Sequence, residues 1–180
     1  MSEERPLVGT EFVTPFGPVA VVVSPEDGVL RASSLSSLSH LVGTLPPALG
    51  RRGVEHGDNP LIARAIAAWL SGDGSALGAV PAWQDGGSFV QRVWEAMRKI
   101  PSGQVMTYGE LAAAAGNPRA ARAVGHACST NTLAPFVPCH RVVASTGLGN
   151  YGFGGPEVKA RMLRLEGAPV ARTGTKEFAA

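Results

Sequence analysis

Residues 136–143 read Phe136-Val137-Pro138-Cys139-His140-Arg141-Val142-Val143, and the rest of the 180-residue chain is organised around them. Bulky apolar residues on both sides of a Cys-His pair are typical of a thiol at the end of a buried strand or in a turn. Pro138 has no N–H for a strand ladder, so we expect it to end the extended run ahead of Cys139. A thiol is nucleophilic as the thiolate, and a neighbouring histidine, acting through a water or directly, commonly generates it. The stretch therefore predicts a reactive cysteine.

Three other roles for Cys139 remain open on the residues alone. It could be a buried core cysteine, the usual fate of an intracellular Cys. It could bind a metal with His126, Cys128 and His140, but adjacent Cys and His seldom both reach one tetrahedral ion, and the usual ligand spacings are absent. It could be a hydrolase nucleophile with His140 as its base, although such enzymes bring their base from a distant segment. We expect Cys128 to be buried filler.

The composition predicts a folded, intracellular protein. With 44% hydrophobic and 17% charged residues the chain is globular rather than disordered. Two cysteines cannot form a disulfide framework, and a reactive thiol survives best in a reducing compartment. The first residues lack the apolar core of a signal peptide, and no apolar run has the length of a membrane span. We therefore expect a soluble cytoplasmic protein, associated with the nucleoid if bacterial.

Charge is unevenly distributed along the chain. Residues 1–87 carry a formal charge of −4, and residues 88–180 carry +6. A basic C-terminal half favours contact with a polyanion, with ordinary surface variation as the alternative.

The N-terminal half has the pattern of a small α/β unit. Residues 19–23 and 29–32 are strand-like and flank turn residues, which predicts a hairpin. A third strand is expected near Leu41-Val42. Asn59-Pro60 predicts the start of a helix over residues 61–70. The glycine-rich residues 71–87 are interpreted as a linker.

The C-terminal half is predicted to be helical. Apolar periodicity favours a helix over residues 88–100, and Thr107 with Glu110 has capping-box spacing ahead of a helix to residue 115. Gly116 then Asn117-Pro118 predict a turn into a helix from Arg119 to about residue 130. Two short helices joined by a tight turn indicate a helix-turn-helix, or a helical hairpin in the core. A last helix is expected over residues 157–166, ended by Gly167.

The helix expected from Arg119 has a basic stripe beside small side chains. Arg119, Arg122 and His126 share one face, next to a surface with almost no side chain that consists of Ala120, Ala121, Ala123 and Gly125. Small residues allow a backbone to approach another surface closely, and arginine can reach phosphates or probe a groove. The alternative is close packing of an alanine-rich helix in the core.

Residues 138–142, Pro-Cys-His-Arg-Val, resemble the active-site motif of the O6-alkylguanine-DNA alkyltransferases, the methylated-DNA–protein-cysteine methyltransferases. Further motifs of that family recur in the same order and spacing: Ile100-Pro101-Ser102-Gly103, Thr107-Tyr108-Gly109, Ala115-Gly116-Asn117-Pro118, Ala121-Arg122-Ala123-Val124-Gly125, Asn131 and Leu165-Glu166-Gly167. The resemblance implies an α/β protein. Residues 1–87 would form a small ribonuclease H-like α/β domain with a linker, and residues 88–168 a mostly helical DNA-binding catalytic domain with a helix-turn-helix. From its terminal position alone, the stretch of residues 169–180 is expected to be a mobile tail.

The resemblance also implies a reaction. Cys139 would accept the alkyl group from O6 of guanine in DNA, irreversibly and once per molecule, with O4 of thymine as an open second substrate. His140 would act through a water as the base for Cys139, and Glu166 would orient the imidazole. Asn131 would brace the turn that carries the site, and Tyr108 would donate a proton to the departing guanine.

By the same resemblance, the partner is double-stranded DNA containing O6-alkylguanine. Arg122 would replace the extruded nucleotide, since the flipped base of a weakened pair is the substrate. The other expected DNA contacts are Arg119, Ala120, Ala121, Ala123, Gly125 and Thr107, and the base pocket would comprise Val142 (through its main chain), Tyr151, Gly152 and Phe153. Lys159 falls at a lysine position of the family. We expect a monomer with no cofactor, no metal and no membrane partner.

This chain departs from the family pattern at several positions. Thr132 and Ala134 stand where the family usually has proline, and residues 151–155 read Tyr-Gly-Phe-Gly-Gly in place of Tyr, a small residue and Gly-Gly. The competing functions are a protein that binds alkylguanine without transfer, a helix-turn-helix regulator with a thiol sensor, and a thiol hydrolase. Family relatives that only bind lack the cysteine.

Overall fold

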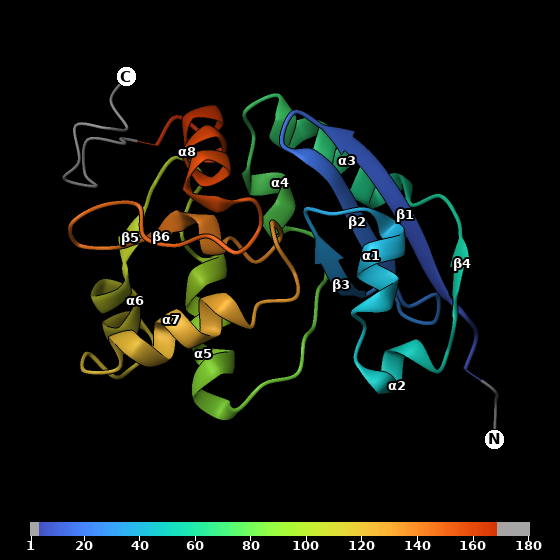
Figure 1. The fold of residues 1–180 in the computed structure, drawn as a ribbon, viewed down its shortest axis with the longest axis horizontal. Coiled ribbons are helices and arrows are strands. Elements are labelled where there is room, and N and C mark those ends of the chain that lie inside the picture. The colour runs from blue at the N-terminus through green and yellow to red at the C-terminus, as the bar shows by residue number, and fades with distance from the viewer. Residues whose placement is uncertain (1–3, 169–180) are drawn as a thin grey trace.

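A four-stranded sheet and a set of short helices form a mixed α/β fold in the computed structural model, which describes residues 4–168 (Figure 1). The predicted tail, residues 169–180, lies outside these residues. The strands are β1 (Leu7–Thr14), β2 (Gly17–Val23), β3 (Leu30–Ser34) and β4 (Val54–His56), in the order β3-β2-β1-β4. The β1–β2 and β2–β3 pairs are antiparallel, whereas β4 runs parallel to β1.

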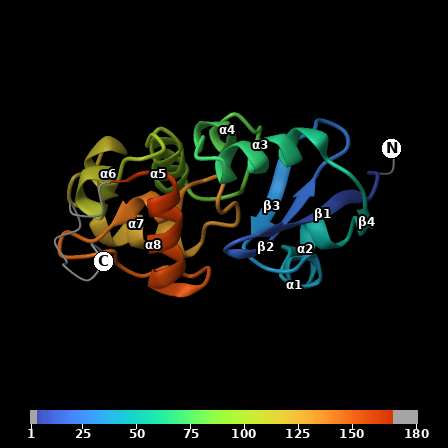
Figure 2. The ribbon, with the colours of Figure 1, turned by 90° about the horizontal axis from the view of Figure 1, so that it is seen from above.

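The predicted hairpin is confirmed as β2 and β3, and its apolar run is explained by burial on both faces. Val19, Val21 and Val23 pack on the side of α3 (Pro60–Leu70), while Ala20 and Val22 pack on the opposite side. Figure 2 shows α3 on one side of the sheet and α1 (Leu38–Gly43) with α2 (Pro47–Gly50) on the other. A strand covered on both faces is apolar throughout rather than alternating.

The strand predicted near Leu41-Val42 is wrong, because these residues belong to α1. The Ser37 side chain caps this helix by accepting a hydrogen bond from the His40 N–H at 3.2 Å. Leu41 alone of the helix is buried, and it joins the apolar cluster on that face of the sheet. The sequence analysis missed β1, where Gly9, Thr10 and Glu11 interrupt the apolar pattern, and it also missed the short strand β4.

The helix expected after Asn59 is confirmed as α3, and the Asn59 side chain accepts from the Ile62 N–H at 3.1 Å. The segment that follows contains a short helix, α4 (Ser75–Gly78). Its last part runs along β3, since the Leu30 N–H donates to the Pro81 carbonyl at 2.9 Å and the Trp83 N–H donates to the Leu30 carbonyl at 3.0 Å. Residues 81–83 are therefore bound to the sheet.

The C-terminal half is helical, as expected. It contains α5 (Ser88–Arg98), β5 (Met106–Thr107), α6 (Tyr108–Ala114), α7 (Ala121–Ser129), the 3-10 turn η1 (Cys139–Arg141), β6 (Val142–Val143) and α8 (Gly155–Leu165). The capping box of Thr107 and Glu110 is present. Gly116 and Gly167 follow the ends of α6 and α8 with φ of +92° and +71°, a backbone conformation that favours glycine.

The start of α7 differs from the prediction, because this helix begins at Ala121 rather than at Arg119. The Asn117 side chain accepts a hydrogen bond from the Arg119 N–H at 3.2 Å, two residues on, and so stabilises a turn instead of capping a helix. Arg119 therefore precedes the helix, and the expected stripe of three basic residues on one helix face is reduced to Arg122 and His126.

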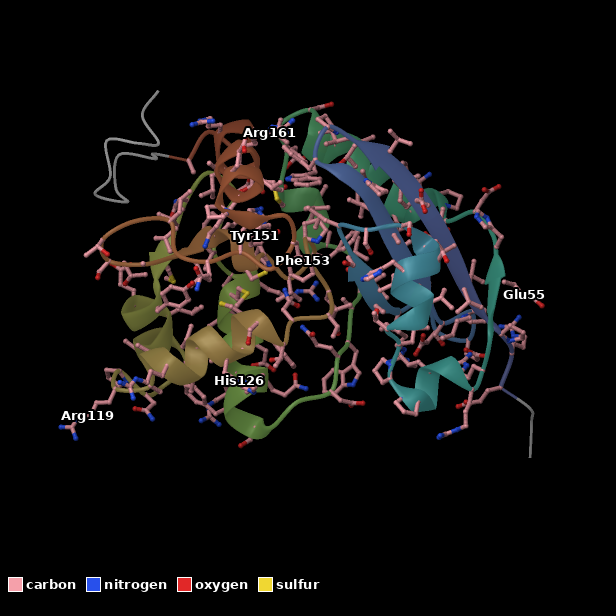
Figure 3. The ribbon with its side chains drawn as sticks, viewed as in Figure 1. Glu55, Arg119, His126, Tyr151, Phe153 and Arg161 are labelled. Carbon is pink, nitrogen blue, oxygen red and sulfur yellow. The ribbon has the colours of Figure 1, made fainter. Side chains whose placement is uncertain are left out.

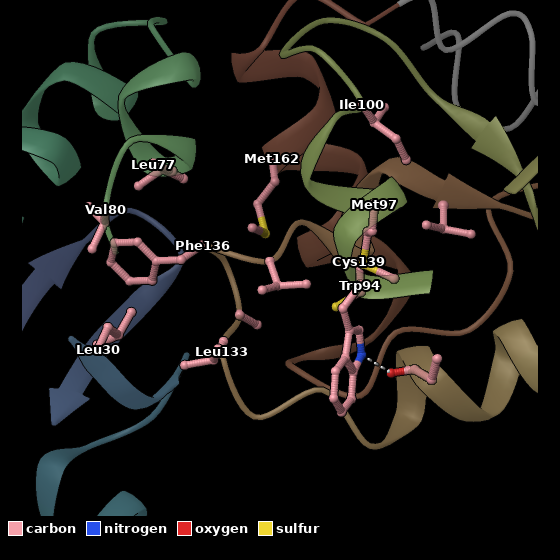
Figure 4. Packing of buried hydrophobic residues seen from close by; sticks show 14 of the residues in the cluster. Leu30, Leu77, Val80, Trp94, Met97, Ile100, Leu133, Phe136, Cys139 and Met162 are labelled. Atoms are coloured by element: carbon pink, nitrogen blue, oxygen red, sulfur yellow. Dashed lines mark hydrogen bonds between the residues drawn. The ribbon is translucent and has the colours of Figure 1, made fainter. Parts of the chain in front are cut away.

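One hydrophobic core joins the two halves of the chain. Leu30, Leu77 and Val80 from the N-terminal half pack in the same cluster as Phe136 and Met162 (Figure 4). Because the core is continuous, the strands and α3 support the segment that carries Cys139. None of the helices within residues 4–168 is long and apolar enough to cross a membrane.

Candidate active site

Cys139 begins the η1 turn, and Asn131 holds the segment that leads to it. The Asn131 Nδ2 group donates to the Val137 carbonyl at 2.9 Å and to Cys139 Sγ at 3.3 Å. Its Oδ1 atom accepts from the Leu133 N–H at 3.0 Å and from Gln84 Nε2 at 3.0 Å. Asn131 thus fixes the bend between residues 131 and 139, and it also contacts the sulfur itself.

The environment of Cys139 favours the protonated thiol over the thiolate. Burial raises the pKa of the thiol, because a charged sulfur loses its hydration. The hydrogen bond from Asn131 and the charge of Lys159 act in the opposite direction. The site therefore needs a base, and it already holds two groups that stabilise the sulfur once it is charged.

His140 has one ring nitrogen that is free to accept a proton. Its Nε2 atom lies 3.0 Å from Glu166 Oε1, and because a carboxylate only accepts, Nε2 carries the proton. Burial lowers the pKa of His140, which favours the neutral ring, so Nδ1 keeps a free lone pair. Nδ1 is buried and has no hydrogen-bond partner among the described residues. It is the atom at which the imidazole can accept a proton.

Glu166 stays ionised because three side chains donate to it. Burial alone would raise its pKa, but His140 and Arg141 lower it to about 2. Arg141 binds the carboxylate through Nε at 2.9 Å and Nη2 at 2.8 Å, and the Trp69 indole donates to Oε1 at 3.0 Å. The sequence analysis did not single out Arg141, although it follows His140 in the motif. Trp69, in α3, carried no sequence signal.

Lys159 is a fully buried cation beside the site. Its ammonium donates to the carbonyls of Val142 at 2.6 Å, Leu148 at 2.7 Å and Asn150 at 3.3 Å. Burial lowers the pKa of Lys159 to about 8, and the nearby Cys139 thiolate would raise it. No ion pair within residues 4–168 involves Lys159. Its charge is therefore available to Cys139, and its bonds hold the loop after the active-site turn.

A cavity of about 910 Å³ opens over Cys139. Of the residues predicted for the site, it is lined by Tyr108, Ala121, Arg122, Gly125, Cys139, Tyr151 and Gly152. Its size is that of a small-molecule pocket. Segments far apart in sequence, α6, α7 and the loop before α8, thus form one pocket around the thiol.

Two residues expected in the pocket are absent from its lining. Val142 and Phe153 are not among the lining residues. The Val142 carbonyl accepts from Lys159, and the Phe153 ring packs 5.5 Å from the Tyr151 ring (Figure 3). Phe153 thus packs against a lining residue, Tyr151, and the Val142 carbonyl is bound by the Lys159 ammonium.

The remaining predicted DNA contacts surround α7. Arg119 is exposed and points away from the molecule at the turn before α7 (Figure 3), Ala120 is the N-cap of that helix, and Ala123 is half-buried within it. Thr107 is the N-cap of α6. None of these four lines the cavity.

The expectation that Cys128 is buried filler is wrong. Its side chain is half-buried and lines the same cavity as Cys139. Burial is the main cause, and the nearby Cys139 a smaller one, that raises the pKa of Cys128 to about 12. Cys128 therefore stays a protonated thiol at neutral pH.

Across residues 4–168 no group of three or more His, Cys, Asp or Glu side chains is arranged to hold a metal ion.

Comparison with known proteins shows similarity to one family. The model of the DNA-binding domain of 6-O-methylguanine DNA methyltransferase matches residues 88–168. A methylated-DNA–protein-cysteine methyltransferase of Shigella flexneri is 36% identical over 89% of this chain and 96% of its own length. The constitutive enzyme of Bacillus subtilis is 38% identical over 64% of this chain and 72% of its own.

Solved structures agree. Mycobacterium tuberculosis OGT in complex with DNA has a TM-score of 0.71 at 31% identity, covering 94% of this chain and 99% of that one. The O6-methylguanine-DNA methyltransferase of Pyrococcus kodakaraensis has a TM-score of 0.65 at 27% identity, covering 90% and 99%.

Proposed function

Because the chain belongs to the methylated-DNA–protein-cysteine methyltransferase family, we propose that Cys139 is the residue to which it transfers the alkyl group from O6 of guanine in DNA. The function is DNA repair, and the partner is damaged DNA. The observation that supports Cys139 most directly is its position in the cavity, with Asn131 on the sulfur and His140 beside it in the chain.

The reaction is one displacement at carbon. The Cys139 thiolate attacks the alkyl carbon, an S–C bond forms, and the bond from carbon to O6 breaks with its electron pair on the guanine. His140 takes the thiol proton at Nδ1 through a water, and the Glu166 carboxylate balances the imidazolium. Tyr108, which lines the cavity, donates a proton to the departing guanine. The thioether is not cleaved again, so each molecule reacts once.

DNA reaches the cavity along α7. Arg122 is exposed and also lines the cavity, so it can occupy the stack while the alkylated nucleotide is extruded. Ala121, Ala123 and Gly125 keep the helix surface low enough to lie in the minor groove. Arg119, Ala120 and Thr107 flank this surface and contact the DNA backbone.

The extruded base lies against Tyr151 and Gly152. Phe153 fixes the Tyr151 ring from behind, and the Val142 carbonyl, which already accepts from Lys159, offers its second lone pair to the base. The second substrate, O4-alkylthymine, would bind in the same pocket and transfer its alkyl group to the same thiol.

We further propose the finer description of the fold. Residues 1–87 form a ribonuclease H-like domain with its linker, and residues 88–168 form the catalytic DNA-binding domain. There α6 and α7, joined through Gly116, are the helix-turn-helix. The protein acts as a monomer in the cytoplasm, at the nucleoid in a bacterium.

The test is incubation with duplex DNA containing one O6-methylguanine, followed by mass spectrometry. Trypsin leaves both cysteines in one peptide, residues 123–141, so fragmentation must place the methyl group. We expect one methyl per molecule on Cys139 and none in Cys139→Ala. Tight binding without an adduct would instead indicate a recognition protein.

A further inference from the structure

Gln84 lies in the segment that the sequence analysis took for a linker, yet it is buried against the active-site turn. Its exposed fraction is 8%, and it lies outside residues 88–168, which the family model matches. Its Nε2 group donates to Asn131 Oδ1 at 3.0 Å. Its Oε1 atom accepts from both the N–H and the hydroxyl of Thr132, at 2.8 and 3.0 Å. We call Gln84, Asn131 and Thr132 the Gln84 bridge.

The orientation of both amides in the bridge is fixed by main-chain groups. The Thr132 N–H can only donate, so the Gln84 oxygen faces it and the Gln84 nitrogen faces Asn131. The Leu133 N–H and the Val137 carbonyl fix the Asn131 amide in the same way, with its nitrogen toward Cys139 Sγ. Every donor thus meets an acceptor from residue 84 to the sulfur.

Thr132 supplies both of the hydrogen bonds to Gln84 Oε1. The resembling family usually has proline at this position, and proline has neither an N–H nor a hydroxyl. Neither of the two bonds to Gln84 Oε1 could then form. Proline would stiffen the backbone next to Asn131 by its ring, whereas here side-chain bonds from another segment hold it.

The rest of the molecule anchors both ends of the bridge. The Gln91 side chain donates to the Gln84 carbonyl at 2.7 Å. On the other side, the Ser33 N–H and hydroxyl donate to the carbonyls of Thr132 and Ala134 at 2.8 and 2.9 Å. A connected set of hydrogen bonds therefore links the N-terminal sheet to Asn131 and fixes where Asn131 lies.

We propose that Gln84 is a positioning residue for the alkyl transfer, which acts through Asn131 to keep the amide nitrogen on Cys139 Sγ. A firmly held amide N–H stabilises the thiolate, because a donor to a charged sulfur favours the charged form. This inference rests on the proposed role of Cys139. It assigns a catalytic contribution to a residue that precedes the helical half.

The test replaces Gln84 with an uncharged residue of similar length, Gln84→Met. The titratable groups around the thiol are Lys159, Tyr108, Tyr151, Cys128 and His140 with Glu166, and the substitution changes none of them. Any change in the pKa of Cys139 then reports on the bridge. The matched control is Gln104→Met, at an exposed glutamine.

Two rates are measured against pH: alkylation of Cys139 by iodoacetamide, resolved from Cys128 by fragmentation, and methyl transfer from O6-methylguanine in duplex DNA. We expect Gln84→Met to raise the pKa of Cys139 by about 0.5 to 1 and to slow transfer about three- to tenfold at neutral pH. Below the thiol pKa both rates should fall by the same factor, whereas a general folding defect would expose Cys139 and raise its rate with iodoacetamide. DNA affinity should stay unchanged.

Two further variants separate the possible outcomes. In an Asn131→Ala background, Gln84→Met should have no additional effect on the thiol, because its partner is gone. If Gln84→Met does not fold, Thr132→Val, which loses only the hydroxyl bond, should give a smaller rise in the pKa of Cys139. An unchanged thiol pKa in a folded variant overturns the inference while wild-type transfer to Cys139 still stands. Absence of transfer in the wild type overturns the proposed function instead.

Discussion

Lys159 offers a prediction in which the sign and the size both follow from the structure. Its pKa is lowered by burial from 10.5 to about 8. Between these values the unfolded chain binds a proton that the folded chain has released, so stability rises with pH. Integrated from pH 7 to pH 9, this linkage stabilises the folded state by about 1.3 kcal/mol.

The perturbation is Lys159→Met, which keeps the length of the side chain and removes the titrating group. Urea unfolding at pH 7, 8 and 9 gives the free energy of unfolding of both proteins. We expect the wild type to gain about 1.3 kcal/mol over the variant across this range. Keeping to pH 9 and below limits the contribution of Cys128 and Cys139, whose raised pKa values act in the opposite direction.

The same variant should lose activity. Without the cation the Cys139 thiolate lacks a stabilising charge, and the carbonyls of Val142, Leu148 and Asn150 lose their shared donor. We expect methyl transfer at pH 7 to fall about tenfold or more. The control is Lys99→Met, at an exposed lysine. If the free energy of unfolding has the same pH dependence in the wild type and in Lys159→Met, the reasoning is refuted, because Lys159 would then titrate alike in the folded and unfolded states.

Three further predictions concern the carboxylate and the DNA. The pKa of Glu166 is held at about 2, so the wild type should lose about 3 kcal/mol of stability as the pH falls from about 4.5 toward 2. Glu166→Gln should lack this loss in an acid-unfolding series, and an equal loss would contradict the assignment. Trp69→Phe removes a buried donor to that carboxylate and should cost about 1.5–3 kcal/mol in urea unfolding. Trp94→Phe loses a hydrogen bond to a neutral carbonyl. If Trp69→Phe costs less than Trp94→Phe, the Trp69 hydrogen bond to the charged Glu166 is not the stronger of the two. Arg122→Ala should slow transfer from duplex DNA but not from a free O6-alkylguanine base, and equal slowing of both would show that Arg122 does not act in base extrusion.

Local signals in the sequence predicted most of the helices. Asn59 caps α3, Thr107 and Glu110 form the capping box of α6, and Gly167 ends α8, because each of these depends on groups within a few residues. The failures have equally local causes. Asn117 favours an Asx turn over a cap, which delays α7, and the isolated Leu41 belongs to a short helix whose apolar contacts come from the sheet.

The residues of the reactive site were predictable only in part. Cys139, His140, Asn131 and Glu166 were expected from motifs, and the structure brings them together. Trp69 and Gln84 could not be found this way, because a tryptophan in an apolar helix and a glutamine in a glycine-rich segment match many environments. Their hydrogen bonds span 97 and 47 residues of the chain.

By itself the sequence indicated the residues to which we assign the reaction, because nucleophile, base and carboxylate are properties of residue type and of motifs that can be read along the chain. Only the tertiary structure decided how those atoms are tuned. Burial decides whether the pKa values of Cys139, His140 and Lys159 are raised or lowered. This burial is produced by segments that meet from both halves of the chain. The free energy of a charge depends on everything packed around it, and that environment exists only after the chain has folded.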